Sequence, residues 1–302
     1  MKNTKLTLLF CLLTTLAFSS VSTKERNALL AIYQSTQGEN WTETWNLDAP
    51  MSSWCGISIV NDNVVAIDLS FNNLQGELPD ELGDLVYLQS LNLFRNRING
   101  TLPESFGNLK QLENLNIAFN NLEGKIPENI SELSSLRTLQ LFMNQLEGGI
   151  PVNIGALENL EVLELYNNNL SGTLPVSLGD LSSLESLQLS SNLFNGKLPS
   201  SLYKLSELKI LSVFGNKLMG SLSPSIVNLT NLEELVLSNN AFYGNLPSNF
   251  TDLNKLKILL LTNNNFEGEL VDLKDKFPDL KQFDFVNTRS QSSLATLEDD
   301  DD

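Results

Sequence analysis

The sequence contains no histidine among its 302 residues. Histidine is the commonest general base in enzymes, and it completes the Ser/His/Asp and Cys/His arrangements that activate a nucleophile. Its absence excludes those catalytic arrangements and every metal site that is built on an imidazole ligand. A pair of carboxylates is the simplest catalyst that remains open to this chain.

Cysteine is also scarce, with only Cys11 and Cys55 present. Cys11 lies in an N-terminal apolar segment, and removal of that segment leaves one cysteine and no internal disulfide. An exported chain of this length must then hold itself together by packing. A free thiol at Cys55 can pair with another chain, but a buried structural cysteine is the favoured interpretation.

Positive charge is in short supply, because 19 lysines and arginines stand against 36 acids and give a formal net charge of −17. Such a chain is not expected to bind nucleic acid, which needs clustered basic side chains. The four bases Arg95, Arg97, Lys217 and Arg289 are too scattered to form a groove for an anion. A neutral or basic ligand, such as a peptide or a glycan, is favoured.

Long apolar runs are absent after the first 22 residues, so no membrane span is predicted in the mature chain. Residues 1–22 carry Lys2 and Lys5, then an apolar stretch from Leu6 to Phe18, then small residues. This order is typical of a secretory signal peptide, with a membrane anchor as the less favoured alternative. Cleavage after Ser19 and cleavage after Ser22 are both possible. The mature protein is predicted to be secreted, either extracellular or at the cell surface.

What the sequence does contain is a repeat. One asparagine recurs at intervals of 24 residues, and a glycine follows each copy four residues later. The asparagines are Asn72, Asn96, Asn120, Asn144, Asn168, Asn192, Asn216, Asn240 and Asn264. A proline stands seven residues after most of them. Self-similarity at a fixed period of this length indicates a solenoid.

The positions five and three residues before each asparagine are apolar, as in Leu91 and Leu93 or Leu139 and Leu141. An alternation of period two predicts a short strand with one buried face. No single repeat can bury its own apolar edge, whereas stacked copies share one core. The strands of successive copies are therefore expected to pair as a parallel sheet.

This pattern of leucines, asparagine, glycine and proline resembles the leucine-rich repeat, in the 24-residue variety of plant receptor-like proteins. The resemblance covers about residues 66–288, as nine regular repeats and one degenerate copy. It implies an α/β repeat fold: a solenoid with a parallel sheet on its concave face and short helical or irregular segments on its convex side. It also implies that the repeat asparagine, Asn168 for example, is a buried framework residue that satisfies backbone groups.

Residues 23–65 are predicted to cap the first repeat, with a helix that begins at a capping box of Ser22 and Glu25 and ends near Gly38. Three tryptophans follow, interpreted as packing residues of the cap: Trp41, Trp45 and Trp54. This region resembles the N-terminal cap module of secreted leucine-rich repeat proteins. The positions of the usual plant cap cysteines hold Ser52 and Ile59. In this respect the cap resembles that of exported bacterial and algal proteins, which lack the disulfide. Residues 289–302 are predicted to be an acidic disordered tail.

A catalytic carboxylate pair should stand on the exposed strand positions of neighbouring repeats, because adjacent strands lie about 4.8 Å apart. Four residues before the asparagine, however, Glu164 lies between two glutamines. Six residues before it, the acid is Glu234, about three repeats away. We therefore predict that the protein is not an enzyme and takes no cofactor or metal.

The variable strand positions are the candidate binding surface, because a solenoid places its specificity there. Large apolar side chains one and two residues before the asparagine form a predicted band across the first five repeats: Phe71, Phe94, Phe119, Phe142, Met143 and Tyr166. A polar column lies beside them: Asn92, Asn116, Gln140, Glu164 and Gln188. The alternative is that some of these rings tuck into the loop after the strand and only cover the backbone.

The sequence thus predicts a non-catalytic extracellular module that recognises a protein, a peptide or a glycan through its concave face. We expect a monomer. Two alternatives stay open: a structural or adhesive surface protein, whose regular repeats matter more than one ligand, and an inhibitor of a cell-wall hydrolase. The missing cap cysteines weigh against the inhibitor.

Overall fold

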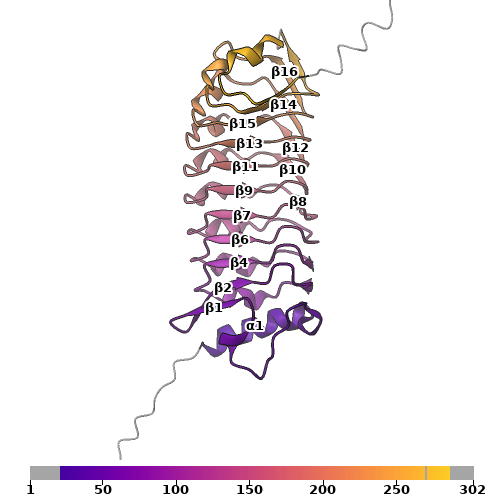
Figure 1. Ribbon diagram of the computed structural model, residues 1–302, viewed down its shortest axis with the longest axis vertical. Helices are drawn as coiled ribbons and strands as arrows, with labels where there is room; N and C mark the ends of the chain where they lie inside the picture. Colours follow the sequence, from indigo (N-terminus) through magenta and orange to yellow (C-terminus); the bar gives the residue numbers. More distant parts are fainter. Residues whose placement is uncertain (1–20, 269–270, 286–302) are drawn as a thin grey trace, which may run out of the picture.

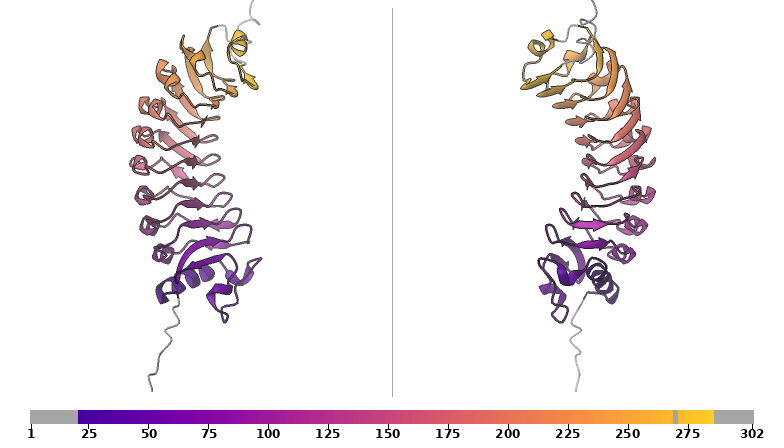
Figure 2. Two further views of the ribbon diagram at one scale, coloured as in Figure 1. Left: turned by 60° about the vertical axis from the view of Figure 1, so that its left-hand side comes forward. Right: turned by 90° about the vertical axis from the view of Figure 1, so that its right-hand side faces the viewer.

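The computed structural model describes residues 21–268 and 271–285. The predicted signal peptide up to residue 20, the end of the degenerate repeat and the predicted acidic tail lie outside the described residues. Within the described ranges the chain is a coil of stacked turns that together form an arc (Figures 1 and 2). The predicted leucine-rich repeat solenoid is confirmed.

One long sheet runs the length of the arc and follows the order of the chain (Figure 1). Its strands are β1 (Ile57–Val60), β2 (Asn63–Asp68), β4 (Ser90–Asn92), β6 (Asn114–Asn116), β7 (Thr138–Gln140), β9 (Val162–Glu164), β11 (Ser186–Gln188), β13 (Ile210–Ser212), β15 (Glu234–Val236), β17 (Ile258–Leu260) and β19 (Gln282–Asp284). The first pair, β1 and β2, is antiparallel. From β2 onward the strands are parallel, and each residue pairs with the residue 24 positions later, as Leu91 does with Leu115.

A second sheet, which the repeat pattern does not predict, follows the repeat asparagines. It contains β8 (Glu147–Gly148), β10 (Asn169–Thr173), β12 (Leu193–Gly196), β14 (Lys217–Gly220), β16 (Ala241–Asn245) and β18 (Asn265–Glu267). Nearer the N-terminus, β3 (Gln75–Glu77) pairs with β5 (Arg97–Asn99). The signal for these strands is a second period-two alternation, in which Leu170, Phe194 and Leu218 are fully buried and their neighbours face outward.

Short 3₁₀ segments form the convex side of the arc (Figure 2). They are η3 (Asp80–Asp84), η4 (Glu104–Asn108), η5 (Glu128–Glu132), η6 (Ile154–Ala156), η7 (Val176–Asp180), η8 (Ser200–Lys204), η9 (Pro224–Asn228), η10 (Phe250–Asp252) and η11 (Val271–Lys276). A proline in extended conformation precedes several of them, such as Pro103 and Pro175. These segments pack closely, and a methyl group at Gly179 would collide with the backbone carbonyl of Ser201 in the next turn.

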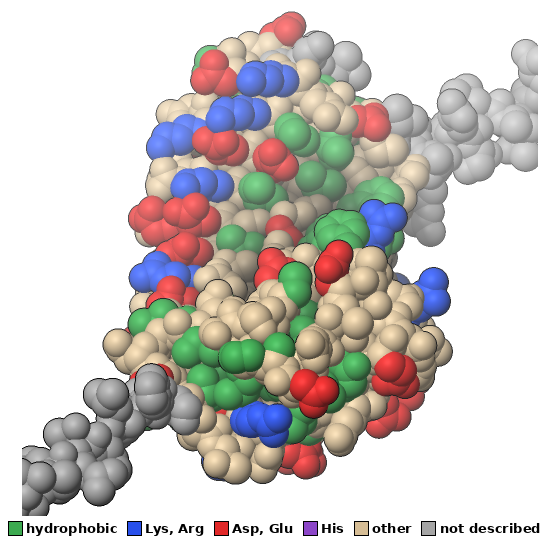
Figure 3. Space-filling model, turned by 60° about the horizontal axis from the view of Figure 1, so that its bottom comes forward, with side chains coloured by type: hydrophobic (Ala, Val, Ile, Leu, Met, Phe, Trp, Pro, Cys, Tyr) green, Lys and Arg blue, Asp and Glu red, His purple; other side chains and the backbone are tan. Residues whose placement is uncertain are grey.

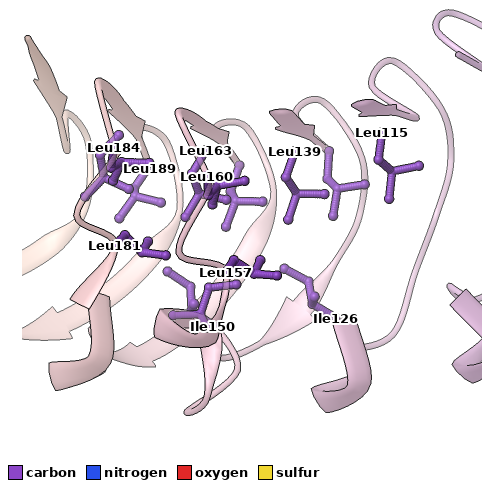
Figure 4. Close-up of a cluster of buried hydrophobic side chains, with 14 of the residues drawn as sticks. Leu115, Ile126, Leu139, Ile150, Leu157, Leu160, Leu163, Leu181, Leu184 and Leu189 are labelled. Atoms are coloured by element: carbon purple, nitrogen blue, oxygen red, sulfur yellow. The ribbon is translucent and has the colours of Figure 1, made fainter. Parts of the chain in front are cut away.

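The core is a ladder of leucines and isoleucines between the two sides of the coil (Figure 4). Leu115, Leu139 and Leu163 lie one above another because their strands pair in register. All three are completely buried, as is Leu160, which leads into the strand. The predicted alternation of buried positions along each strand is therefore confirmed.

The repeat asparagines form a second, polar ladder inside the coil. The Asn168 side-chain amide donates to the backbone carbonyls of Leu165 and Leu141, both at 3.0 Å, and its oxygen accepts from the Leu146 amide at 3.1 Å. Asn120, Asn144 and Asn192 make the same contacts one turn apart. The predicted framework role is confirmed, since each asparagine satisfies backbone groups of two turns.

Replacing Asn168 with alanine is expected to lower the free energy of unfolding by about 1–3 kcal/mol, because it leaves buried backbone groups without partners. The control is Asn169→Ala, since Asn169 is exposed and makes only a 3.5 Å contact with the Gln145 carbonyl. Urea denaturation of both variants measures the difference. Equal midpoints for the two variants would contradict the framework role.

The N-terminal cap closes the first turn. Helix α1 (Thr23–Ser35) begins at the predicted capping box, in which Ser22 and Glu25 bond each other's backbone amides. Glu25 is buried, and its second oxygen accepts from the Val64 amide at 2.9 Å, which ties the helix to β2. The three tryptophans are buried, and their indole N–H groups donate to backbone carbonyls of the cap. Their packing role is confirmed.

The prediction of a buried Cys55 is wrong, because this side chain is exposed. The chain turns at Gly56, which has a φ of 80°. Just before this turn, neighbouring side chains point alternately into the cap and out of it. Trp54 takes the inward position, so its neighbour Cys55 points outward. The backbone carbonyl of Cys55 still serves the cap by accepting from the Trp45 indole at 2.9 Å.

Candidate functional site

The concave face of the arc is lined by the long sheet (Figure 2). Along each strand the middle residue is buried while its two neighbours are half-buried and face the hollow, as in β7, β9 and β13. Figure 3 shows hydrophobic side chains gathered in this hollow among polar ones. The predicted site residues that follow these strands come together here.

Five aromatic rings form a continuous chain across the first turns. Phe71 meets Phe94 edge to face at 5.3 Å between ring centroids, and Phe94 meets Phe119 in the same way at 5.4 Å. Phe119 contacts Phe142 at 5.8 Å, and Phe142 stacks on Tyr166 at 4.4 Å with an interplanar angle of 11°. Each step is within the range of favourable ring contacts. We call these five rings the aromatic band.

The rings differ in exposure. Phe71 is 58% exposed and Phe119 37%, and Met143 beside them is equally open at 37%. Phe142 is only 8% exposed. Phe142 fits the alternative interpretation, in which a ring just before the asparagine is tucked in and is not available to a ligand. The rings of Phe119 and Tyr166 lie against it and cover it. Phe142 is therefore the buried member of the band and supports its neighbours, which present the accessible surface.

Several bulky residues of this region hold a left-handed backbone. The φ angles of Phe71, Arg95, Phe119 and Met143 lie between 53° and 56°. This conformation costs a bulky side chain roughly 1–2 kcal/mol, whereas glycine and asparagine adopt it more readily. The same position of other turns holds mainly small or amide residues: Asn167, Ser191, Gly215, Asn239 and Asn263.

The turn itself does not explain the bulky side chains at these positions. The chain must turn sharply at this point so that the following asparagine enters the coil, and asparagine or glycine would meet that need at lower cost. Phenylalanine, arginine and methionine instead occupy it in the first four turns. The guanidinium of Arg95 lies 5.5 Å from the centroid of the Phe71 ring, so it also covers part of the band.

The predicted polar column lies beside the band, and side-chain hydrogen bonds join its members in two places. Asn116 lies between them and accepts only from the backbone amide of Ala118, at 3.1 Å. Glu164 is held between two glutamines: Gln140 donates to one carboxylate oxygen at 2.8 Å and Gln188 to the other at 3.0 Å. Near the N-terminal end Asn92 donates to Asp68 at 3.1 Å. The structure thus brings Glu164 together with amides, as the sequence predicted.

Two groups of this face have shifted pKa values. Burial raises the pKa of the Tyr166 hydroxyl, and the negative charge of Glu164 raises it further. Partial burial of Asp68 opposes its ionisation, but hydrogen bonds from Ser70 and Asn92 outweigh that effect and lower its pKa. At neutral pH this face therefore presents a protonated phenol and a stabilised carboxylate.

An aliphatic patch on the C-terminal strands was missed by the sequence analysis. Ile210 and Ile258 flank Glu234 in register, and Val236 pairs with Leu260. The four aliphatic side chains are half-buried and face the hollow from β13, β15 and β17. The signal in the sequence is that each of these strands holds a β-branched residue or leucine at one exposed position at least, and β17 holds Ile258 and Leu260 at both.

One edge of the long sheet carries ion pairs between adjacent turns, visible as alternating red and blue in Figure 3. They join Arg137 to Glu161, Lys209 to Glu185, and Lys257 to Glu233. All of these side chains are substantially exposed, so each pair contributes little to stability. Their charges offset each other, which leaves this edge without a strong charge of one sign.

Within the described ranges, no cluster of three acidic or cysteine side chains is placed to hold a metal ion. No helix of those ranges is long and apolar enough to cross a bilayer.

Three family models match the chain. They are described as "Leucine-rich repeat region" for residues 68–171, "Leucine rich repeat" for residues 158–218, and "Leucine Rich Repeat" for residues 231–253. Together they cover more than half of the sequence, and they agree with the asparagine ladder and the parallel sheet. The chain belongs to the leucine-rich repeat family.

Solved structures and a curated relative refine this assignment. The Arabidopsis receptor kinase HAESA, in complex with the peptide hormone IDA and the co-receptor SERK1, is 37% identical with a TM-score of 0.76, over 88% of this chain and 45% of that one. A plant ice-binding protein is 27% identical with a TM-score of 0.76, over 87% of this chain and 86% of that one. Polygalacturonase inhibitor 1 of Arabidopsis thaliana is 33% identical over 88 residues, which are 28% of this chain and 27% of the inhibitor.

The chain thus spans less than half of the receptor and about a quarter of the inhibitor. Similarity to plant receptor ectodomains and to a protein inhibitor supports an extracellular binding module built from leucine-rich repeats. The relatives have different functions on one scaffold, so the ligand must be argued from the exposed side chains.

Proposed function

We propose that the protein is a non-catalytic module that binds an extended segment of a peptide or protein against its concave face. The observation that carries this proposal is the aromatic band, in which the exposed rings of Phe71 and Phe119 occupy strained backbone positions beside a polar column. Aromatic side chains are the residues most often responsible for binding energy at protein interfaces. The HAESA structure supports the proposal, since that similar solenoid is in complex with a peptide hormone.

The band is suited to side chains of an extended chain more than to a single small molecule. Its rings meet mostly edge to face, one turn after another, so they form a continuous apolar strip along the arc. Adjacent turns are about 4.8 Å apart, close to the rise of one to two residues of an extended strand. A polypeptide that runs along the arc can therefore place side chains on successive turns.

A combined peptide and glycan array tests the proposal, probed with wild type and with the double variant Phe71→Ala/Phe119→Ala. We expect wild type to retain a set of peptides and the double variant to lose about tenfold or more in affinity for them. Alanine at these two positions keeps the left-handed backbone cost, so the comparison isolates the rings.

The matched control is Val152→Ala/Val176→Ala, which removes two exposed apolar side chains from the convex side, at 66% and 71% exposure. This control should bind like wild type. Retention of glycans alone, or equal binding by the two double variants, would contradict a peptide-binding concave face. Unchanged adhesion to all surfaces by the Phe71/Phe119 variant would instead favour the structural or adhesive alternative.

The second candidate function is inhibition of a cell-wall hydrolase, which the similarity to polygalacturonase inhibitor 1 favours. It predicts that the purified protein lowers the activity of a polygalacturonase in a saturable manner. The same Phe71→Ala/Phe119→Ala variant decides whether such inhibition uses the aromatic band.

A further inference from the structure

We propose that Glu164 and Tyr166 form a subsite for an arginine side chain of the bound polypeptide, at the end of the aromatic band that faces the aliphatic patch. This inference rests on the proposed function and names the chemistry of its ligand. It starts from the contacts of the Glu164 carboxylate. Both of its oxygens accept hydrogen bonds from neutral amides, and it takes part in none of the ion pairs found among the described residues.

The carboxylate is fixed in position without being neutralised. Gln140 and Gln188 are the register partners of Glu164 on the two neighbouring strands. Their side-chain amides therefore hold the carboxylate from both sides. The glutamines leave its full negative charge facing the hollow. A cation supplied by a ligand would meet a prearranged partner, which saves the ordering cost of a mobile surface pair.

Tyr166 supplies an aromatic surface beside that charge. One face of its ring stacks on Phe142. In the next turn the equivalent position holds the small residue Ser190, whose hydroxyl bonds that of Ser212 at 2.7 Å. Among the described rings Tyr166 contacts Phe142 alone, so its side toward Ser190 is not covered by another ring.

Glu164, the side of Tyr166 without a ring contact and the Ser190 hydroxyl thus belong to neighbouring turns, and they offer a carboxylate, an aromatic ring and hydroxyl oxygens. A guanidinium is planar and delocalised, so it can stack on an aromatic face while donating to a carboxylate. An ammonium group can use the charge but not the stacking, which places arginine ahead of lysine. The overall charge of −17 also favours the approach of a basic segment.

The apolar residues on either side of the subsite predict how far from the arginine the apolar residues of the bound peptide lie. Phe119 and Met143 belong to the two turns before Glu164, about 5–10 Å away at a strand separation of roughly 4.8 Å. Val236 belongs to the third turn after it, about 14 Å away by the same spacing. An extended chain advances about 3.3 Å per residue, so the arginine should have an apolar residue two or three positions to one side and another about four to the other side.

A randomised peptide-display library panned on wild type and on Glu164→Gln tests the subsite. Glutamine keeps the shape at this position, accepting from one neighbouring amide and donating to the other, so the fold should survive. We expect wild type to enrich peptides with arginine between apolar residues, and Glu164→Gln to lose that enrichment. The matched control is Glu161→Gln, which removes the same charge from the edge of the sheet, where Glu161 pairs with Arg137.

The most strongly enriched peptide is then resynthesised with citrulline, the neutral isostere of arginine. We expect citrulline to weaken binding to wild type about tenfold and to change binding to Glu164→Gln by less than about twofold, with Glu161→Gln behaving like wild type. Enrichment without arginine, or equal citrulline effects on wild type and Glu164→Gln, would overturn the subsite.

The two proposals fail in different ways. Ring-dependent binding of peptides that ignores Glu164 would overturn the subsite and leave the proposed function standing. Recovery of no peptide by wild type, or of peptides that bind the Phe71→Ala/Phe119→Ala variant equally well, would overturn both.

Discussion

Trp45→Ala is expected to lower the free energy of unfolding by about 3–5 kcal/mol, the range for removal of a large buried ring. Trp45 is 3% exposed and lies at the centre of the cap. It stacks on Trp54 at 4.7 Å, meets Trp41 edge to face at 4.9 Å, and contacts Tyr33 at 6.0 Å. Its indole also satisfies the Cys55 carbonyl. Alanine removes all of these contacts and opens a cavity.

The effect should extend beyond the cap, because a solenoid end without its cap exposes the apolar core of the first turn. Urea denaturation followed by circular dichroism measures the loss. Cys55→Ser is the control: its side chain is exposed, and the change should stay within about 0.5 kcal/mol. A Trp45→Ala protein that unfolds at the wild-type midpoint would show that the cap is not part of the cooperative unit.

Phe142→Ala is expected to destabilise the protein by about 3 kcal/mol, since it removes a buried ring that joins Phe119 to Tyr166. Phe119→Ala should cost less, because that ring is far more exposed. Thermal and urea denaturation of the two variants measure the order. Affinity for the array-selected peptide should fall in both, in Phe142→Ala because Tyr166 loses its stacking partner.

Phe142→Leu serves as the volume-preserving control and should recover most of the stability. A Phe142→Ala protein with an unchanged melting temperature and weakened binding would show that this ring is a direct contact and not a support.

Much of the fold follows from the sequence because each rule repeats. The 24-residue period, the alternation around Leu91 and Leu93, and the framework role of Asn168 depend on local pattern and on the need to satisfy buried backbone groups. Nine copies of the asparagine make each inference robust. The capping box at Ser22 and Glu25 is equally local, and the structure has it.

Features that depend on neighbouring turns were harder to predict. In the second sheet each residue pairs with the residue 22 positions later, as Ser171 does with Leu193. This register differs from the 24-residue register of the main sheet, so the repeat period alone does not predict it. Cys55 was misplaced because the turn at Gly56 decides which of two adjacent side chains enters the cap. In both cases the backbone path, which composition does not reveal, sets the direction of the side chains.

The candidate site shows the same division. The residues one and two positions before the asparagine could be located from the repeat, and the structure joins them into one band. The exposure of each ring could not be predicted from the repeat, because it depends on neighbouring turns. Phe142, for example, is covered by rings from the turns on either side. The aliphatic patch was overlooked because Ile210, Val236 and Leu260 are ordinary strand residues, and only their common orientation makes them a surface.

Photo-crosslinking tests the central claim, that a polypeptide binds along the concave face, most directly. A benzophenone amino acid replaces Phe119 in one variant and Val176, on the convex side, in another. Each is irradiated with the array-selected peptide. We predict a covalent adduct at position 119, suppressed by excess unlabelled peptide, and none at position 176. Equal crosslinking at both positions, or crosslinking at position 176 alone, would contradict the account.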